Sequence, residues 1–304
     1  MDKEITVHLM TTWRRRLSFC GLLALAAAAA PQAQDLTAET EAWRAEREAR
    51  LAADDGWLTV AGLFFLTEGD NTFGASPLND IVLRTGPDSA GVFTLRRGEI
   101  TVRATAGETL TIDGRDTATA RLWPYEGGSR PTIAIGPLSL FGHYSGDRLA
   151  IRMRDRDSEI RRGFTGLRWF PVAEDFRVRG RYIPHAEPRT VELPNILGDV
   201  ETFRTSGSVA FSVGGAEHRM TAFDAGGRLW FIFRDLTSGS ETYPAARFLY
   251  ADPPEDGWTT VDFNRAYNPP CAFNPYTTCP LPPLENRLPV RVEAGEMDYH
   301  TAGE

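Results

Sequence analysis

Short apolar stretches separated by turn residues fill most of this chain, and their spacing constrains its fold more than any other feature. Candidate strands follow one another closely, as at residues 91–95, 99–104 and 118–122. In residues 149–154, apolar side chains alternate with arginines, which predicts a half-buried strand. Short strands punctuated by Gly, Asp and Asn are typical of antiparallel sandwiches and barrels. We therefore expect a mainly β, antiparallel fold.

A proline-rich segment at residues 184–194 divides the chain into two β-rich parts. Beyond it, short strands joined by Gly-Gly turns between residues 209 and 233 predict an antiparallel meander. We predict an N-terminal β part at residues 55–190 and a C-terminal β part at residues 191–304. The expected architecture is an antiparallel β-sandwich and meander in two packed parts.

Residues 1–33 have the pattern of a secretory signal. The basic residues 14–16 precede an apolar run at 17–30, and small residues offer cleavage points near Ala33. The apolar run is shorter than the roughly 20 residues that a membrane-spanning helix needs. We therefore expect an exported protein, located in the periplasm or secreted.

Residues 34–54 are rich in good helix formers. Their apolar positions are sparse and reduce to Leu36, Trp43 and Leu51. A helix with so narrow an apolar stripe lies on the surface of a fold rather than in its core. We predict a peripheral N-terminal helix.

The chain is acidic, and its only lysine is Lys3. It has 33 Lys and Arg residues against 41 Asp and Glu; without residues 1–33, 29 and 39 remain. An acidic chain is repelled by phosphate backbones, so nucleic acid is not an expected partner. After residue 33 no apolar run is long enough to span a bilayer. Without lysine in the mature chain, Schiff-base chemistry and the phosphate-binding P-loop are excluded.

Motifs for metals, cofactors and serine hydrolases are also missing. The histidines at 143, 185, 218 and 300 are isolated, and no zinc-binding spacing occurs. The GHYSG run at 142–146 has its serine one position late for a nucleophile elbow. We predict no metal and no cofactor.

Cys271 and Cys279 are the only cysteines beyond the signal region. An even number of cysteines in an exported protein predicts a disulfide. Their spacing is not that of a C-x-x-C redox motif, which favours a structural bridge. The segment around them is rich in Pro and Asn and has turn chemistry suited to a closed loop.

Polar side chains follow the strongest apolar strands of the C-terminal part. We call them the polar cluster: Arg234, Asp235, Glu241, Tyr243, Arg247, Asp262, Asn264, Tyr267 and Asn268. If the strands pair as a hairpin, Glu241, Tyr243 and Arg247 share one face of the returning strand. Because an Arg fork grips carboxylates, the cluster predicts either a cradle for a small polar ligand or an internal ion network.

Three functions remain open on these residues. The first is an exported protein of unknown activity that binds a small polar ligand at the polar cluster. The second is a non-catalytic structural or interaction module of the cell envelope, with the cluster as an internal network and a protein partner of unknown identity. The third is an envelope hydrolase that uses Glu241 and Asp262 as an acid and base pair.

Several long runs resemble one bacterial family. FRDLTSGSETYPAARFLY at residues 233–250 and DFNRAYNPPCAFNPYTTCPLPPLENRLPV at 262–290 are similar to the C-terminal signature of domain of unknown function 1684. Residues 55–83 resemble its N-terminal signature and residues 163–185 its middle. That family has no established activity, so the resemblance implies no catalytic residues. It marks the region around the polar cluster as the distinctive surface.

A second resemblance covers residues 73–83, FGASPLNDIVL, which are similar to the opening strands of forkhead-associated β-sandwich domains. Those domains bind phosphothreonine with an arginine after the glycine, and Ala75 occupies that position here. The resemblance implies a sandwich topology and does not imply phosphopeptide binding.

Overall fold

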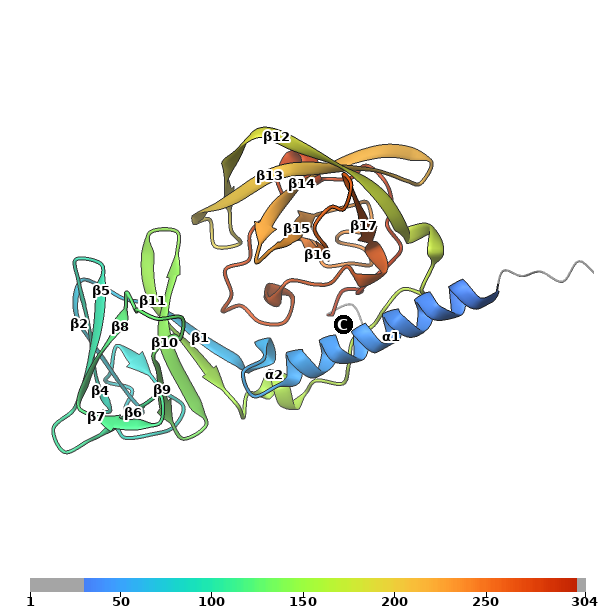
Figure 1. Cartoon of the computed structure of the whole chain (residues 1–304). Helices are drawn as coiled ribbons and strands as arrows, with labels where there is room; N and C mark the ends of the chain where they lie inside the picture. Colours follow the sequence, from blue (N-terminus) through green and yellow to red (C-terminus); the bar gives the residue numbers. More distant parts are fainter. Residues whose placement is uncertain (1–29, 300–304) are drawn as a thin grey trace, which may run out of the picture.

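The computed structural model describes residues 30–299 and shows two β-rich parts beside a long N-terminal helix, α1 (Ala30–Ala52) (Figure 1). The predicted mainly β class with antiparallel sheets and a peripheral helix is confirmed. The helix extends from the N-terminal part along the lower side of the C-terminal part (Figure 1). It contacts the short helices η1 (Trp57–Thr59) and η3 (Phe263–Arg265).

The N-terminal part is a sandwich of a six-stranded and a five-stranded sheet. Their strand orders are β1-β11-β10-β9-β6-β7 and β3-β2-β4-β5-β8, and only the β2–β3 pair is parallel. The strands are β1 (Val60–Phe65), β2 (Gly69–Gly74), β3 (Ile81–Val82), β4 (Gly91–Arg96), β5 (Glu99–Ala104), β6 (Leu110–Ile112), β7 (Arg115–Thr117), β8 (Thr119–Trp123), β9 (Thr132–Ile135), β10 (Leu138–Ser145) and β11 (Arg148–Asp155). Alternate residues such as Phe73, Phe93 and Ile151 point between the sheets and form one apolar core.

The C-terminal part is a six-stranded antiparallel sheet of order β16-β15-β14-β13-β12-β17. Its strands are β12 (Arg177–Pro194), β13 (Val200–Val213), β14 (Ala216–Ala225), β15 (Arg228–Phe233), β16 (Arg247–Ala251) and β17 (Trp258–Asp262). Strands β13, β14 and β15 form the predicted meander. The sheet curls until its edge strands approach, and a bridge joins Phe248 to Tyr267 beyond β17.

The proline-rich segment lies inside β12 and does not interrupt it. The β12–β13 register shifts between Pro184 and Arg189, so Pro184 and Pro188 occur at this bulge, whereas Pro194 ends the strand. Proline lacks an N–H donor and is tolerated in sheets at bulges and edges. The chain passes between the two parts at residues 156–176, which contain α2 (Glu159–Arg162) and the short helix η2 (Glu174–Phe176).

A polar contact joins the β10–β11 hairpin of the sandwich to the β12–β13 hairpin of the C-terminal sheet. Arg148 donates through Nε (2.9 Å) and Nη2 (2.6 Å) to the Asp199 carboxylate. The Ser145 hydroxyl donates to Asp199 over 2.6 Å and accepts from Asn195 over 2.8 Å. The hydrogen bonds from Arg148, first, and from Ser145 hold the pKa of Asp199 below its usual value, although burial opposes them. This clasp fixes one part against the other.

Replacing Asp199 by alanine removes the charged acceptor of the clasp. We expect the free energy of unfolding to fall by about 1–3 kcal/mol, because hydrogen bonds to charged groups are lost. Urea unfolding measures the change, and Asp147→Ala, an exposed carboxylate in the β10–β11 turn, is the control. Equal stability of the Asp199 and Asp147 variants would contradict a clasp that stabilises the fold.

Candidate functional site

The centre of the polar cluster is a closed ion pair. Arg247 donates to the Asp235 carboxylate over 2.7 Å, and both side chains are 0% exposed. They meet because β15 and β16 place Phe233 opposite Arg247 just before the chain turns back. Arg247 also donates to the carbonyl oxygens of Val292 (3.0 Å) and Ala294. Burial lowers the pKa of Arg247, and the Asp235 charge opposes that effect. The pair fastens residues 288–296, the C-terminal segment, to the sheet.

The expectation that Glu241, Tyr243 and Arg247 share one strand face is wrong, because β16 begins only at Arg247. The preceding residues form a compact turn in which the Thr237 carbonyl accepts three successive amides, those of residues 240–242. The Asp235 carboxylate stabilises this turn by accepting from the Thr237 amide (2.8 Å) and hydroxyl (2.7 Å). Hydrogen bonds within the turn therefore prevent these residues from forming a strand with alternating side chains.

Glu241 and Asp262, the predicted acid and base pair, contact different arginines. Glu241 pairs with Arg291, whereas Asp262 lies 3.7 Å from Arg265. Hydrogen bonds from Ser240, first, and from Arg291 lower the pKa of Glu241, so its carboxyl group is ionised and unsuited to act as an acid near neutral pH. This geometry gives no support to the hydrolase hypothesis.

Most other members of the polar cluster bind backbone or neighbouring segments. Asn264 exchanges hydrogen bonds with the backbone of Ala173 (3.0 and 2.9 Å), and Asn268 donates to the Met297 carbonyl (2.8 Å). The Tyr243 hydroxyl donates to the Cys271 carbonyl over 3.1 Å. Arg234 forms a parallel bridge with Arg287 through its backbone. These contacts hold irregular segments to the sheet.

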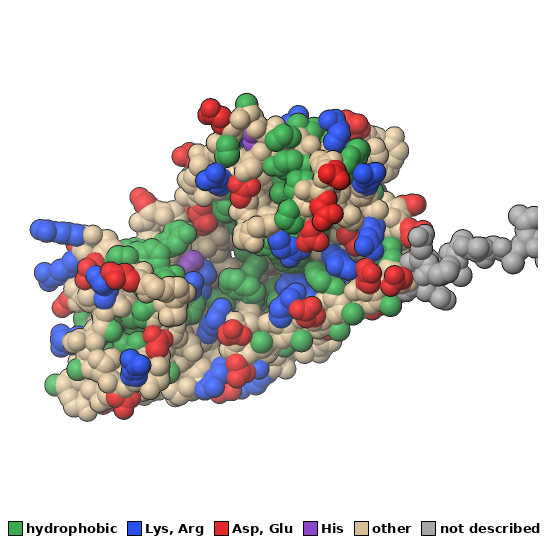
Figure 2. Space-filling model, viewed as in Figure 1, with side chains coloured by type: hydrophobic (Ala, Val, Ile, Leu, Met, Phe, Trp, Pro, Cys, Tyr) green, Lys and Arg blue, Asp and Glu red, His purple; other side chains and the backbone are tan. Residues whose placement is uncertain are grey.

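Asp262 and Tyr267 are the members of the cluster that line a cavity. This cavity of about 640 Å³, the α1 cleft, lies between helix α1 and the C-terminal sheet. Arginines at 47, 50, 177, 228 and 265 line it, with carboxylates at 46, 252 and 262. Figure 2 shows basic side chains around the hollow between the helix and the upper part of the molecule. Positive groups thus exceed negative ones in the α1 cleft, although the whole chain is acidic.

Arg47 connects helix α1 to the floor of the cleft. Its guanidinium lies 4.5 Å from the Tyr267 ring centre, pairs with Glu296 over 3.2 Å and donates to the Asn268 carbonyl over 2.9 Å. Burial raises the pKa of the Glu296 carboxyl group, which Arg47 counteracts. The C-terminal segment that Arg247 anchors thereby positions one wall of the cleft.

The floor of the cleft consists of parallel aromatic rings. Tyr250 is stacked with Tyr267 at 6.3 Å and with Trp230 at 6.2 Å between ring centres. The guanidinium of Arg228 lies 4.9 Å from the centre of the Tyr250 ring. The two tyrosine hydroxyls hydrogen-bond each other, and burial raises the pKa of both. The rings thus offer flat apolar surface to a ligand.

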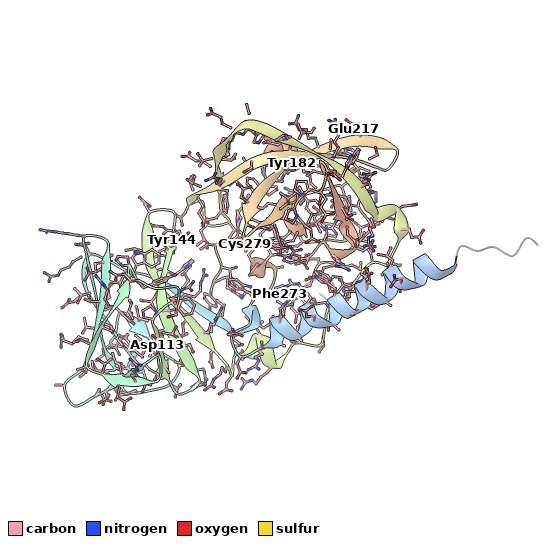
Figure 3. The ribbon with its side chains drawn as sticks, viewed as in Figure 1. Asp113, Tyr144, Tyr182, Glu217, Phe273 and Cys279 are labelled. Carbon is pink, nitrogen blue, oxygen red and sulfur yellow. The ribbon has the colours of Figure 1, made fainter. Side chains whose placement is uncertain are left out.

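A smaller cavity of about 280 Å³, the inner chamber, continues the α1 cleft toward the sandwich. The two cavities share Arg47, Trp57, Tyr250 and Tyr267 as lining residues. The opposite wall comes from residues 277–280 and from Arg152 of β11. Figure 3 shows Cys279 and Phe273 on the segment that lies between the sandwich and the C-terminal sheet.

Arg152 is buried without a counterion. Its side chain is 5% exposed, and its Nε and Nη2 atoms have no hydrogen-bond partner. Burial lowers its pKa to about 10, so the guanidinium stays protonated at neutral pH. Burial, with Arg152 and Arg130 nearby, also lowers the pKa of His143 to about 3, which leaves that imidazole neutral. In residues 30–299 no carboxylate forms an ion pair with Arg152.

The prediction of a half-buried strand at residues 149–154 is wrong, because Ile151, Arg152 and Met153 are all buried. The cysteine-containing segment covers the arginine face of β11, and the Thr278 hydroxyl lies 3.4 Å from His143 Nε2. Strand alternation correctly indicated which side chains share a face. It carried no information on which distant segment covers that face.

Sequence reasoning also missed Arg47 and Trp230. Arg47 faces inward from a helix whose polar residues predicted a solvent-exposed side, and Leu36, Thr40 and Leu51 are buried on that inward face. Trp230 lies in a strand, where alternation alone indicates a core position, but it also lines the inner chamber. The helical spacing of the sequence predicts this buried face only if arginine is grouped with the apolar residues. That grouping is justified because the arginine side chain has a long apolar stem.

Cys271 and Cys279 are free thiols in the structure, so the predicted disulfide is not formed there. The two residues are nevertheless adjacent, since the Cys271 amide donates to Cys279 Sγ over 3.2 Å. The hydrogen bond with Cys279 lowers the pKa of the Cys271 thiol, whereas burial raises that of Cys279 well above its usual value. The pair lies beside the inner chamber, which Cys279 lines.

Within the described residues, no group of three or more His, Cys, Asp or Glu side chains is arranged to hold a metal ion. No helix of residues 30–299 is both long and apolar enough to cross a membrane.

Comparisons with known proteins identify relatives but no activity. Residues 162–297 match the profile of the family described as "Protein of unknown function (DUF1684)". The solution NMR structure of an uncharacterized protein of Haloarcula marismortui is 32% identical. The match covers 46% of this chain and 80% of that chain, with a TM-score of 0.40. No curated protein matches the chain significantly.

Replacing Arg247 by methionine leaves Asp235 as an unpaired buried charge. We expect the free energy of unfolding to fall by about 3–5 kcal/mol, the usual effect of breaking a buried pair. Urea unfolding followed by circular dichroism measures the loss. The control is Arg204→Met, which removes an exposed pair with Asp224 on the same sheet and costs at most about 1 kcal/mol. Similar losses for both variants would contradict a framework role for the Arg247–Asp235 pair.

Proposed function

The chain belongs to the family described as "Protein of unknown function (DUF1684)", which brings no activity with it, and we propose from the geometry that it binds a small anionic ligand. The binding site is the α1 cleft together with the inner chamber, and Arg152 is the anchor for the anionic group. Tyr267 and Asp262 of the polar cluster belong to this site, whereas Arg247 and Asp235 form the framework behind it.

The observation that carries this proposal is the unpaired charge of Arg152. The buried arginines in the described part of the chain are Arg44, Arg47, Arg152 and Arg247. All but Arg152 form an ion pair, with Glu41, Glu296 and Asp235 respectively. An uncompensated buried charge is costly, and such costs are characteristic of binding sites that are completed by a ligand.

The electrostatics of the α1 cleft favour the entry of an anion. Arginines outnumber carboxylates along its lining, and the side chains of Arg228 and Arg265 remain partly exposed. An excess of one sign of charge in a cleft raises the local concentration of ligands of the opposite sign. An acidic protein surface surrounding a basic cleft also confines anion binding to that cleft.

A structural or interaction module of the envelope is the second candidate, and the closed Arg247–Asp235 pair favours it for that half of the polar cluster. The structural-module hypothesis does not explain why Arg152 is buried without an ion-pair partner. Export through the signal-like residues 1–33 also belongs to the proposal, and residues 1–29 of that segment lie outside the described part of the chain.

Replacing Arg152 by methionine separates the two candidates. For an anion site, we expect the ligand-free variant to be as stable as the wild type or more stable by about 1–3 kcal/mol, because a buried charge disappears. Thermal and urea unfolding measure stability. Phosphate, citrate and benzoate form the anion panel, and any of them that binds should raise the melting temperature of the wild type, since a ligand stabilises the state that binds it. The Arg152→Met variant should not show this rise.

A loss of stability in Arg152→Met, with no anion raising the melting temperature of the wild type, would contradict the anion site and favour the structural module. Arg152→Lys supplies a control that keeps the charge but loses the planar fork. It is expected to retain only weak binding.

We also propose that Cys271 and Cys279 close a disulfide when the chain meets an oxidising compartment. Glutathione disulfide is a sufficient oxidant, because it accepts the two electrons and two protons that the thiols release as the sulfur–sulfur bond forms. After such oxidation, peptide mapping should recover a linked 271–279 peptide, and the free energy of unfolding should rise by about 2–3 kcal/mol. Recovery of separately alkylated thiols from oxidised, folded protein would exclude the bridge.

A further inference from the structure

We propose that the ligand of the inner chamber is a small aromatic carboxylic acid, with its carboxylate on the Nε/Nη2 edge of Arg152 and its ring against the aromatic floor. This inference rests on the proposed function and names the ligand class of the same site. It follows from the unpaired edge of Arg152, an unpaired donor on Trp230, and the size and lining of the chamber.

The unpaired edge of Arg152 consists of the two atoms that bind carboxylates in other arginines of this chain. Arg84 donates through Nε (2.6 Å) and Nη2 (3.0 Å) to the two oxygens of Asp155. Arg148 uses the same two atoms for Asp199. In Arg152 both atoms are buried and have no partner. A planar carboxylate matches this fork with two parallel hydrogen bonds once the side chains that cover the two atoms move aside.

Trp230 contributes a second unsatisfied donor to the chamber. Its indole Nε1 is buried without an acceptor, and the residue lines the same cavity as Arg152. An indole nitrogen can only donate, so its complement is an acceptor. A carboxylate is acceptor-only and offers about four lone-pair sites. An acceptor-rich group on the ligand thus satisfies donors on both walls.

The rest of the lining favours a flat apolar body over a sugar or a nucleotide. Trp57, Phe248 and the stacked rings of Tyr250 and Tyr267 form much of the wall. The tyrosine hydroxyls bind each other, which leaves few side-chain partners for a polyhydroxylated ligand. At about 280 Å³ the chamber is just below the roughly 300–1,000 Å³ of pockets for drug-sized ligands, so a single ring fits best.

The neighbouring thiol does not replace the missing anion. Cys279 lines the chamber near Arg152, but burial keeps the pKa of its thiol well above the usual value. The thiol is therefore uncharged at neutral pH. His143, on the strand next to β11, is neutral as well and does not compete for the carboxylate.

Isothermal titration of the full exported chain with benzoate and trans-cinnamate tests the inference, with benzamide, cinnamamide and inorganic phosphate as comparisons. We expect the aromatic carboxylates to bind. The uncharged amides, which lose the charged contact with Arg152, and phosphate, which loses the contact with the rings, should each bind at least about tenfold more weakly. Arg152→Met should weaken binding of benzoate by roughly tenfold to a hundredfold, and Trp230→Phe by a smaller factor.

Arg154→Met is the matched control. Arg154 lies two residues along β11 on the same face and is also partly buried, but it does not line the inner chamber. Its replacement should leave the affinity for benzoate unchanged. Circular dichroism and melting temperature establish that each variant is folded.

The outcomes separate the two proposals. If phosphate binds in an Arg152-dependent manner and aromatic carboxylates do not, the anion site stands and its ligand class is wrong. Equal binding of benzoate and benzamide also overturns the carboxylate inference. If no anion binds, or if binding is unchanged in Arg152→Met, both the ligand class and the proposed function fail.

Discussion

The buried pair between Arg247 and Asp235 is the interaction on which the site depends. Through its hydrogen bonds to Val292 and Ala294, Arg247 fixes the C-terminal segment inside the curled sheet. That segment carries Glu296, which pairs with Arg47 of helix α1 and so holds the helix over Tyr267. The α1 cleft therefore depends on a buried charge pair outside its lining, because that pair orders the chain end that supports the cleft.

The buried arginines of this protein differ in their surroundings, because some have acceptors for their guanidinium groups and one does not. A guanidinium removed from water needs acceptors, and Arg247 finds them in a carboxylate and two carbonyl groups. Arg47 finds them in Glu296 and the Asn268 carbonyl. Arg152 is held by the same kind of packing without such acceptors. The difference lies in the surroundings, so it is visible only after the chain has folded.

The sequence predicted the β architecture well, because turn residues and alternation are local signals. The meander of the C-terminal part follows from glycine turns and from alternating side chains such as those of Val209 and Phe211. The contacts within the polar cluster were harder to predict, since its members were grouped only because they lie close together in the sequence. Asp235 and Arg247 do meet, but the Thr237 turn takes Glu241 elsewhere. Arg152 was beyond prediction, because residues more than a hundred positions later in the chain cover its face of β11.

The distribution of the site over the chain limits what the family match can convey. The matched residues 162–297 contain the aromatic floor and the cysteine-containing segment. Arg47, Trp57 and Arg152 lie before them, on helix α1, helix η1 and the sandwich. The floor alone has Arg228 beside Tyr250 but lacks the buried, unpaired guanidinium of Arg152. Only the contact between the two β parts, held by the clasp at Asp199, converts that surface into a chamber with a cation at its end. The proposed recognition of an anion is thus a property of the junction, and neither part carries the site alone.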